Sequence, residues 1–500
     1  MGLARTLSRG QAGLDAYLVT VEVHIAGGLP GIAVTGLPAA AVRESKDRVR
    51  AALATSGHTL SASRITVHLG PADIPKTGGR FDLAIALGVV LAQDEALQWP
   101  VSATEFLGEL ALNGDLRPIN GALPAALAAQ HAGHALVLPE ANAAEAALVP
   151  DAEVYAAAHF KDVVRHLSGE QRLPRVAARS EPIPTGSAPD LADVRGQAFA
   201  KRALIVAAAG HHNLLMIGPP GSGKSMLAER LSGLLPPLTR DEMLRVASIA
   251  SVAGELRSAP PTSSPPFRAP HHTTSPQALV GGGTRPRPGE ISLAHRGVLF
   301  MDELPEFGRS ALEALREPLE SGVARISRVH DQLTFPAEFM LVAAMNPCFC
   351  GYLGDGTERC KCTPYKLEQY RGRISGPLLD RFDLHVEVPR VPFADIGEPA
   401  ESSESAAVRE TVVAARRVQL ERAGKLNARL DARSLWRAVK LGAEQRALLK
   451  RAADRWQLSA RSSLRVLKVA RTVADLAGSS AVTTEHVAEA LQLRCRDRQV

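Results

Sequence analysis

Residues suited to binding phosphate stand together at positions 213–225, which read NLLMIGPPGSGKS. A short apolar run precedes a loop of Gly and Pro, after which Lys224 and Ser225 begin a predicted helix. Backbone N–H groups of such a loop converge on phosphate oxygens, while the lysine reaches the β and γ phosphates and the hydroxyl faces magnesium. The order strand, loop and helix therefore predicts a nucleoside triphosphate site rather than an ordinary turn. The predicted binding residues are Gly218, Pro219, Pro220, Gly221, Ser222, Gly223, Lys224 and Ser225.

Polar residues also follow two other apolar runs of strand length. Residues 297–304 read GVLFMDEL, and ligands bind at the carboxyl ends of buried parallel strands. We therefore expect Asp302 to hold magnesium through water and Glu303 to polarise the water that attacks the γ phosphate. Two surface acids that begin a helix are the alternative. Residues 339–344 predict a further core strand, after which Asn346 is placed to orient the attacking water.

An arginine is expected to complete the site from a neighbouring subunit. Arg381 lies in SGPLLDRFDLHVEV, residues 375–388, directly before an alternating strand pattern. As an arginine finger it would neutralise charge in the transition state, and Arg373 is a weaker candidate. The alternative is a local ion pair of Arg381 with Asp380 or Asp383.

Four cysteines have the spacing C-x-C-x9-C-x-C and are Cys348, Cys350, Cys360 and Cys362. Two short thiolate pairs that close a loop suit tetrahedral zinc, although C-x2-C is the more usual spacing. Free thiols or an oxidation-prone pair are the alternative. The remaining Cys495 is expected to be inert.

The elements around these residues form an α/β core, with helices predicted after the phosphate loop and a hairpin predicted within residues 324–335. Residues 257–291 are rich in Pro and Gly and are expected to be irregular. Residues 407–500 predict a bundle of helices. This segment carries 20 Lys and Arg against 9 Asp and Glu, a net charge of +11, which leaves −5 for the rest of the +6 chain. Such a basic module suits a polyanion, although solvated helix faces are the alternative.

The first 168 residues alternate β-branched and Ala-rich runs and predict a separate α/β domain. Within it, GPADIPKTGGRFDLAIALGVVLA (70–92) and GELALNGDLRPINGALPAALAAQHAGHALVLPEANAAEA (108–146) resemble the proteolytic domain of Lon-type proteases. Where those enzymes carry a serine nucleophile and a lysine base, this chain has Arg80 and Leu123. Neither side chain can perform that chemistry, so we expect a non-proteolytic domain used for assembly or for gripping a substrate.

Taken together, the motifs resemble the ComM/YifB family of magnesium-chelatase-like AAA+ ATPases over nearly the whole chain. The specific segments are RAPHHTTSPQALVGGG (268–283), LFMDELPEF (299–307), AMNPCFCGYLGD (344–355) and ISGPLLDRFDLHVEV (374–388). The resemblance implies an α/β fold with an AAA+ P-loop parallel-sheet core and a C-terminal helical lid, preceded by the Lon-like domain without its catalytic dyad. It also implies that Arg461 occupies the sensor 2 position, with Arg465 one turn on.

The implied activity is ATP hydrolysis, with magnesium, in a homo-hexameric motor that promotes branch migration of DNA during natural transformation. Single-stranded and branched DNA are the implied partners. A magnesium-chelatase subunit or a protein-remodelling ATPase is the alternative, and a Lon-like protease is excluded by the missing dyad. The predicted organisation is a Lon-like domain at 1–168, a linker at 169–190, an ATPase domain at 191–392 with the cysteine loop at 348–362, a linker at 393–406 and the helical lid at 407–500.

The composition limits the expected location of the protein and the expected way in which it binds DNA. The longest apolar run, residues 83–92, is too short to span a bilayer, so no membrane and a cytoplasmic location are expected. Aromatic residues make up only 4% of the chain, so base stacking is not expected to be the main grip on DNA. We expect phosphate contacts from the arginine-rich C-terminal module, the turn at residues 329–331, and Arg285 and Arg287.

Overall fold

The computed structural model describes residues 2–494 apart from 61, 95, 98, 180–187, 258–260, 284–285, 328–331, 355–357 and 392–402. The chain divides into two compact units, one of Met1–Ile183 with Met243–Thr262 and one of Pro184–Glu242 with Ser263–Val500. Residues 243–262, which the sequence-based limits include in the ATPase domain, thus have their contacts in the first unit. Part of helix α9 (Arg240–Ala253) belongs to this segment.

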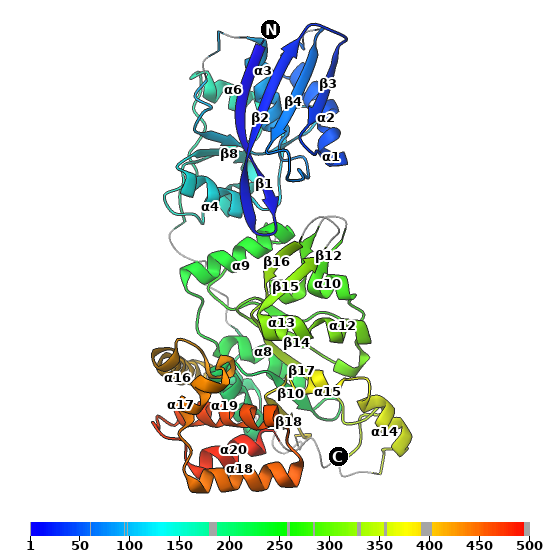
Figure 1. Cartoon of the computed structure of the whole chain (residues 1–500), viewed down its shortest axis with the longest axis vertical. Coiled ribbons are helices and arrows are strands. Elements are labelled where there is room, and N and C mark those ends of the chain that lie inside the picture. Colours follow the sequence, from blue (N-terminus) through cyan, green and yellow to red (C-terminus); the bar gives the residue numbers. More distant parts are fainter. Residues whose placement is uncertain are drawn as a thin grey trace. The chain divides into compact units, whose positions relative to one another are not determined.

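The first unit is built on a mixed sheet of seven described strands in the order β3-β4-β2-β1-β5-β8-β9 (Figure 1). β1 and β2 form a long antiparallel hairpin, and the buried, Ala-rich helix α3 packs on both strands. Strands combine with helices, as the sequence predicts for this segment. The main elements are β1 (Gly2–Ala12), β2 (Asp15–Ala26), β3 (Gly31–Thr35), β4 (Arg64–Gly70), β5 (Thr104–Phe106), β8 (Ala135–Pro139), β9 (Val154–Ala157), α2 (Ser45–Thr55), α3 (Asp82–Gln93), α4 (Ala122–Ala132) and α6 (Phe160–Leu167).

The core of the second unit is a sheet of five described strands in the order β11-β14-β17-β10-β18, and all its neighbouring pairs are parallel. This confirms the predicted P-loop parallel-sheet core. Continuous burial of β14 and β17 explains why both strands are apolar at every position. The strands are β10 (Leu214–Ile217), β11 (Phe267–Arg268), β14 (Val298–Met301), β17 (Met340–Met345) and β18 (Leu384–Glu387).

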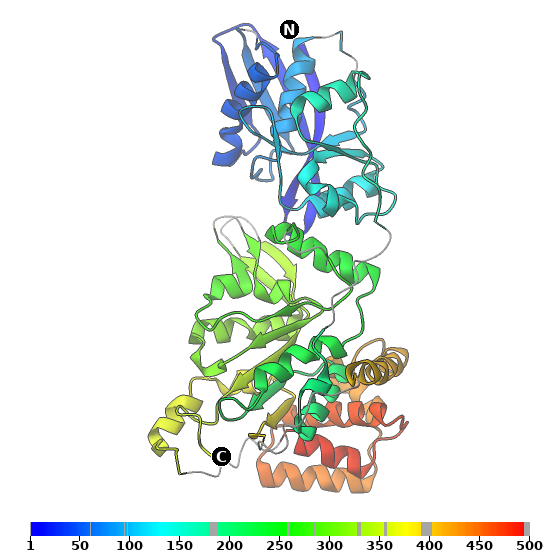
Figure 2. The same cartoon turned by 180° about the vertical axis from the view of Figure 1, so that it is seen from behind.

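Helices of the C-terminal region pack beside α7 (Ala198–Gly210) and α8 (Lys224–Leu234), where Figure 2 shows the orange and red ribbons next to the green ones. They are α16 (Ser405–Ala423), α17 (Ala432–Val439), α18 (Ala443–Trp456), α19 (Ala460–Leu476) and α20 (Thr484–Gln492). The predicted helical lid is confirmed as a helical region. Among the described residues, no helix is both long and apolar enough to cross a membrane.

Two hairpins extend from the core of the second unit. β15 (Val323–Ser327) and β16 (Gln332–Pro336) form the predicted hairpin, whereas its turn at residues 329–331 lies outside the described residues. The segment expected to be irregular contains a second, shorter hairpin of β12 (Gly281–Gly282) and β13 (Arg287–Pro288), flanked by α10 (Pro276–Val280) and α11 (Glu290–Leu293). Both β12 and α10 contact β15, so the hairpins lie side by side. Arg285 also lies outside the described residues.

Candidate nucleotide-binding site

The loop at residues 218–223 connects β10 to α8 and needs glycine at two of its positions. Gly223, directly before α8, has φ +90°, and a Cβ on Gly218 would lie 2.1 Å from the carbonyl oxygen of Val388. In the described structure, no side chain caps the start of α8. Its first N–H groups and the positive end of the helix dipole are therefore available to a phosphate group.

Lys224 lies inside this loop. Its Nζ donates to the carbonyl oxygens of Gly218 (2.7 Å) and Pro219 (2.9 Å) and to Oδ1 of Asn346 (3.3 Å). Burial lowers the pKa of Lys224, and the nearby carboxylates of Asp302 and Glu303 oppose that shift. The ammonium group thus lies among oxygen atoms of the protein. The phosphate oxygens of a bound nucleotide could take their place as acceptors.

The predicted magnesium-binding residues are in direct contact. Ser225 Oγ donates to Oδ2 of Asp302 over 2.7 Å, which joins the start of α8 to the end of β14. A hydroxyl and a carboxylate that converge in this way offer the hard oxygen ligands that magnesium prefers. The structure therefore brings together Lys224, Ser225, Asp302, Glu303 and Asn346, which the sequence scatters over more than a hundred residues.

Glu303 has an unusual backbone conformation. Its φ of +51° and ψ of +47° are left-handed, and its N–H donates to Oδ1 of Asp302 over 2.9 Å. The side chain is 56% exposed, and its Oε2 lies 3.5 Å from Nδ1 of His272. This histidine belongs to the RAPHHTT segment, whose residue types alone do not predict the contact.

The four cysteines form one cluster beside the phosphate loop. Their sulfur atoms all lie within 4.8 Å of one another, with Cys348 Sγ 3.4 Å from Cys350 Sγ and 3.7 Å from Cys360 Sγ. A tetrahedral zinc ion with Zn–S bonds of about 2.3 Å separates its sulfur ligands by about 3.8 Å, so the cluster fits zinc. A backbone hydrogen bond from Tyr352 lowers the pKa of Cys350 to about 6, whereas the neighbouring cysteines Cys350 and Cys348 raise the pKa values of Cys360 and Cys362.

The cysteine loop packs directly against the phosphate loop. A Cβ on Gly351 would lie 2.6 Å from Cδ of Pro220, and Gly351 itself has φ +84°. Cys348 is fully buried and stands two residues after Asn346 at the end of β17. The conformation of the cysteine loop therefore constrains both a residue of the phosphate loop and the residue expected to orient water.

Arg381 and Arg461, which are far apart in the sequence, meet at one carboxylate. Arg381 Nη2 lies 2.9 Å from Oε1 of Glu320, and Arg461 also pairs with this oxygen. The Arg381 guanidinium is only 7% exposed and donates as well to the carbonyl oxygens of Arg316 and Pro377. The ion pair observed for Arg381 is thus with Glu320.

Asp383 and Arg373, which the sequence analysis also considered, have other partners. Asp383 pairs with Arg465 and with His212, whose Nδ1 is 3.2 Å from Oδ2 of Asp383. Arg373 is more exposed and pairs with Glu306 over 2.7 Å. A local pair of Arg381 with Asp383 is therefore not what holds Arg381 in place.

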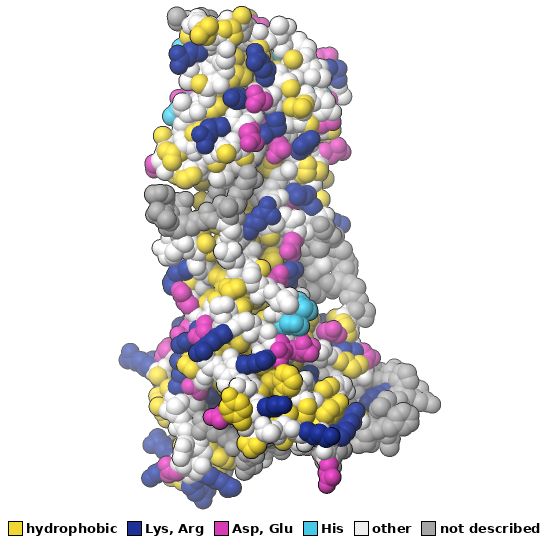
Figure 3. Space-filling view, turned by 90° about the vertical axis from the view of Figure 1, so that its right-hand side faces the viewer, with side chains coloured by type: hydrophobic (Ala, Val, Ile, Leu, Met, Phe, Trp, Pro, Cys, Tyr) yellow, Lys and Arg dark blue, Asp and Glu magenta, His cyan; other side chains and the backbone are white. Residues whose placement is uncertain are grey.

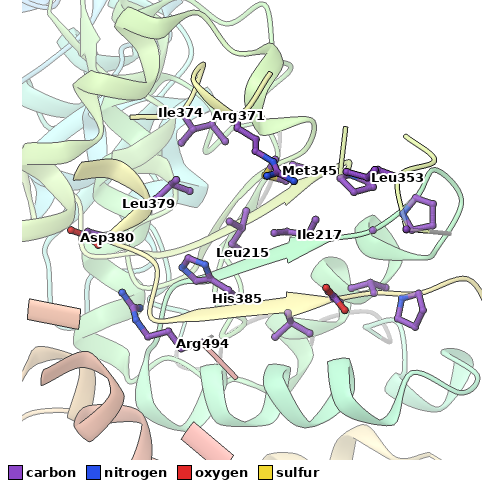
Figure 4. A pocket seen from close by; sticks show the side chains of 18 of the residues that line it. Leu215, Ile217, Met345, Leu353, Arg371, Ile374, Leu379, Asp380, His385 and Arg494 are labelled. Carbon is purple, nitrogen blue, oxygen red and sulfur yellow. The ribbon is translucent and has the colours of Figure 1, made fainter. Parts of the chain in front are cut away.

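A cavity of about 570 Å³ opens on the face of the central sheet opposite α8. In Figure 4, Leu215 and Ile217 extend from β10 into this space and His385 extends from the neighbouring β18. Gly218 and Pro219 also line it, so the cavity reaches the start of the phosphate loop. Its walls are mainly apolar, and they give no specific indication of a ligand.

In the first unit, Arg80 and Leu123 are both buried. Arg80 donates to the carbonyl oxygen of Asn120, and burial lowers the pKa of Arg80 to about 10. The N–H of Leu123 donates to Ser251 Oγ over 3.3 Å, and this hydroxyl donates in turn to Glu145 over 2.5 Å. The two positions thus form part of the packed interior of the first unit.

Comparisons with known proteins cover the whole chain. Family models match at residues 190–396 (magnesium chelatase, subunit ChlI), 21–142 (subunit ChlI of Mg-chelatase) and 402–494 (the C-terminal part of subunit ChlI). Competence protein ComM of Haemophilus influenzae is 48% identical over 503 residues, covering 100% of this chain and 98% of the relative. Protein YifB of Salmonella typhimurium is 45% identical with the same coverage. A chloroplastic magnesium-chelatase subunit ChlI of rice is 23% identical over 57% of this chain and 69% of its own length.

Proposed function

Because the chain belongs to the ComM/YifB family of magnesium-chelatase-like AAA+ ATPases, we propose that it is an ATP-driven DNA motor that promotes branch migration of recombination intermediates in natural transformation. The family implies ATP and magnesium as ligands. The observation that carries the ATPase part is the 2.7 Å contact of Ser225 with Asp302, next to Lys224 and Asn346. The DNA part rests on the relative named for competence and on the basic C-terminal region.

In this proposal each residue of the site has one task in hydrolysis. Lys224 binds the β and γ phosphates, while Ser225 and Asp302 hold magnesium, which neutralises charge on the phosphates. Asn346 orients a water molecule, and Glu303 accepts its proton as the water oxygen bonds to the γ phosphorus. The bond from that phosphorus to the bridging oxygen breaks, and ADP and phosphate leave.

We further propose that Arg381 and Arg461 act on the nucleotide of a neighbouring subunit in a homo-hexamer. Their shared partner Glu320 supports a common task, because one carboxylate holds both guanidinium groups together. Glu320 is 48% exposed, and the Arg461 hydrogen bond together with the Arg381 charge lowers its pKa. To reach a neighbour, Arg381 must exchange its present partners for phosphate oxygens, as arginine fingers require.

We propose that Cys348, Cys350, Cys360 and Cys362 hold one structural zinc ion, which the spacing of their sulfur atoms supports. Four thiolates leave no open position for a reacting group, so the metal would stabilise the loop rather than take part in hydrolysis.

In this proposal the chain binds the DNA backbone through separate basic residues and not through one continuous basic stripe. On the face shown in Figure 3, Lys and Arg side chains are scattered among acidic ones. We propose that the two adjacent hairpins, which include Arg287, contact the DNA strand. Phosphate contacts distributed in this way would bind any sequence.

The rate of ATP hydrolysis with and without forked DNA tests this proposal. A DNA motor should hydrolyse ATP several times faster when the fork is present, and it should bind that DNA. A magnesium-chelatase-type subunit or a protein-remodelling ATPase should show neither effect. A magnesium-chelatase-type subunit is the alternative function, because the matching family models are those of the chelatase subunit.

A further inference from the structure

Helix α17 has one buried face and one face of a different chemical character. Leu435 and Val439 are fully buried, and α17 packs with them against α19 at the edge of the helical region (Figure 1). Opposite these two residues lies a basic-aromatic face of exposed side chains, which belong to Arg433, Trp436, Arg437 and Lys440. Residues three and four positions apart are neighbours on a helix, with Cβ atoms about 5–6 Å apart. The four side chains therefore form one patch.

α17 is fixed at both of its ends. At its start, Asp431 Oδ1 accepts a hydrogen bond from the N–H of Ser434 over 2.9 Å, and Oδ2 accepts one from the Ser434 hydroxyl over 3.0 Å. At its end, the carbonyl oxygen of Ala438 accepts a hydrogen bond from the buried Arg471 of α19 over 3.5 Å. The basic-aromatic face thus lies on a rigid support, so a ligand that binds it does not have to order the helix.

The cations of this face are not neutralised by the protein. Arg433, Arg437 and Lys440 have no ion-pair partner within the part of the chain that the structure describes. By contrast, Arg422 of α16 pairs with Asp475 of α19 over 2.7 Å. Three unpaired positive charges within two turns of a helix create a local positive potential, which favours an anionic partner.

Trp436 adds a planar apolar surface between these cations. It is 48% exposed, so a large part of its ring system stays in water unless a partner covers it. Nucleic-acid bases stack on such a ring, and the contact accepts any base because every base has a π-face. The bases of a duplex are already stacked on one another, so a tryptophan flanked by cations suits a single strand.

We propose that the basic-aromatic face of α17 binds single-stranded DNA, with a base stacked on Trp436 and the adjacent phosphates held by Arg433, Arg437 and Lys440. The helix rises by about 10 Å from Arg433 to Lys440, which is the length of about three stacked nucleotides. The inference rests on the proposed DNA function and adds a binding site on the helical region, apart from the two hairpins. Such a site would hold a single-stranded arm of a fork without reading its sequence.

The test measures binding of the full chain to a fluorescein-labelled single strand of mixed sequence and to an abasic strand of equal length. Trp436→Ala should weaken binding of the mixed-sequence strand roughly 5- to 150-fold, the range expected for the loss of one stacked base. Its affinity for the abasic strand should be unchanged, because that strand offers no base to stack. Trp436→Phe should retain part of the affinity. As a matched control, Leu420→Ala removes a side chain of similar exposure (50%) from α16 and should change neither affinity.

Salt dependence tests the three cations separately from the tryptophan. A variant that combines Arg433→Ala, Arg437→Ala and Lys440→Ala should weaken binding of both strands. It should also reduce the slope of log affinity against log salt concentration by about 2, at about 0.7 per lost phosphate contact. Trp436→Ala should keep the slope of the parent. Quenching of tryptophan emission by the mixed-sequence strand, lost in Trp436→Phe, would report stacking independently of these affinities.

The outcomes distinguish the inference from the proposed function. If the full chain binds neither single-stranded nor forked DNA, both are overturned. If it binds forked DNA and Trp436→Ala binds the mixed-sequence strand as tightly as the parent does, the inference alone is overturned. An equal loss of affinity for the mixed-sequence and abasic strands would also overturn it, as would a change confined to self-association in sedimentation, which would assign the face to a second copy of the chain.

Discussion

Lys224 and Glu303 lie in one site but are proposed to act at different stages of the reaction. Lys224 is expected to contact phosphates already in the ground state, so Lys224→Ala should weaken ATP binding at least about 100-fold, because hydrogen bonds to charged groups contribute about 1.5–3 kcal/mol each. Glu303 is proposed to act only on the attacking water, so Glu303→Gln should bind ATP normally and fail to hydrolyse it. Equilibrium binding of a fluorescent ATP analogue, together with phosphate release, separates the two effects. Tight ATP binding by Lys224→Ala would place the nucleotide elsewhere.

Single residues also show where reasoning from the sequence stops. Ser225, Asp302 and Asn346 could be predicted because each follows a strand in a recognisable motif. His272 and Glu320 could not, because their partners depend on strand register and on the packing of separate helices. Neither residue lies in a pattern whose spacing specifies its contact.

At the scale of elements, long periodic segments were predicted well, and the two-residue strands were missed. Within the bundle of helices predicted for residues 407–500, α19 (Ala460–Leu476) is long and has a broad apolar face. β11 and β12 have two residues each, too few for any periodicity to appear. The helical segment after Gly308 is divided into α12 (Arg309–Ala314) and α13 (Arg316–Ser321), because Pro318 has no N–H to continue the ladder.

The cysteine loop should make the site sensitive to metal removal. Zinc held by the four thiolates would fix a segment that packs on Pro220 and begins two residues after Asn346. Stripping the metal with a strong chelator under reducing conditions should therefore lower kcat for ATP hydrolysis and the melting temperature, and added zinc should restore both. Metal analysis should find one zinc per chain. Freshly purified, reduced protein without zinc would favour the free-thiol alternative.

Asp383 joins β18 to α19 through a buried ion pair, and this junction should respond to acid. Burial alone would raise the pKa of Asp383, but Arg465 and His212 hold it well below its usual range. Such a depressed pKa contributes stability above the unfolded-state pKa of about 3.9, and this contribution is lost as pH falls through the lower folded-state pKa. Asp383→Asn should lower the free energy of unfolding near pH 7 by about 3–5 kcal/mol, because Arg465 keeps a buried, unpaired charge. A denaturant titration at pH 7 checks the loss of stability. Titrations at about pH 4 and about pH 2.5 check the pH dependence, and between them the variant should lose less stability than the parent.

At the scale of the whole molecule, the proposed ring makes the active site a property of the assembly. Arg381→Ala should bind ATP normally and hydrolyse it about 10³- to 10⁵-fold more slowly, since a finger acting in trans has that effect. Mixing this variant with Glu303→Gln should restore some activity, because a mixed ring contains interfaces at which both residues are intact. Phosphate release from the mixture, compared with each variant alone, measures this rescue. Full activity in a chain that stays monomeric would contradict the ring.

DNA binding by the whole chain should depend on salt far more than on sequence. The C-terminal segment is rich in arginine, aromatic residues are scarce, and a motor that moves junctions must pass any base pair. If about six phosphates are neutralised, the affinity should fall by about three orders of magnitude between 50 and 200 mM salt. Fluorescence anisotropy with two forks of equal length and unrelated sequence would measure both dependences, and the two affinities should agree within a small factor at every salt concentration. Arg287→Ala should weaken both complexes equally, because a phosphate contact carries no base readout. It should also reduce the slope of log affinity against log salt concentration by about 1. An affinity that does not change with salt, or a strong preference for one fork, would contradict binding through the DNA backbone. Either result would favour the chelatase-type or protein-remodelling function.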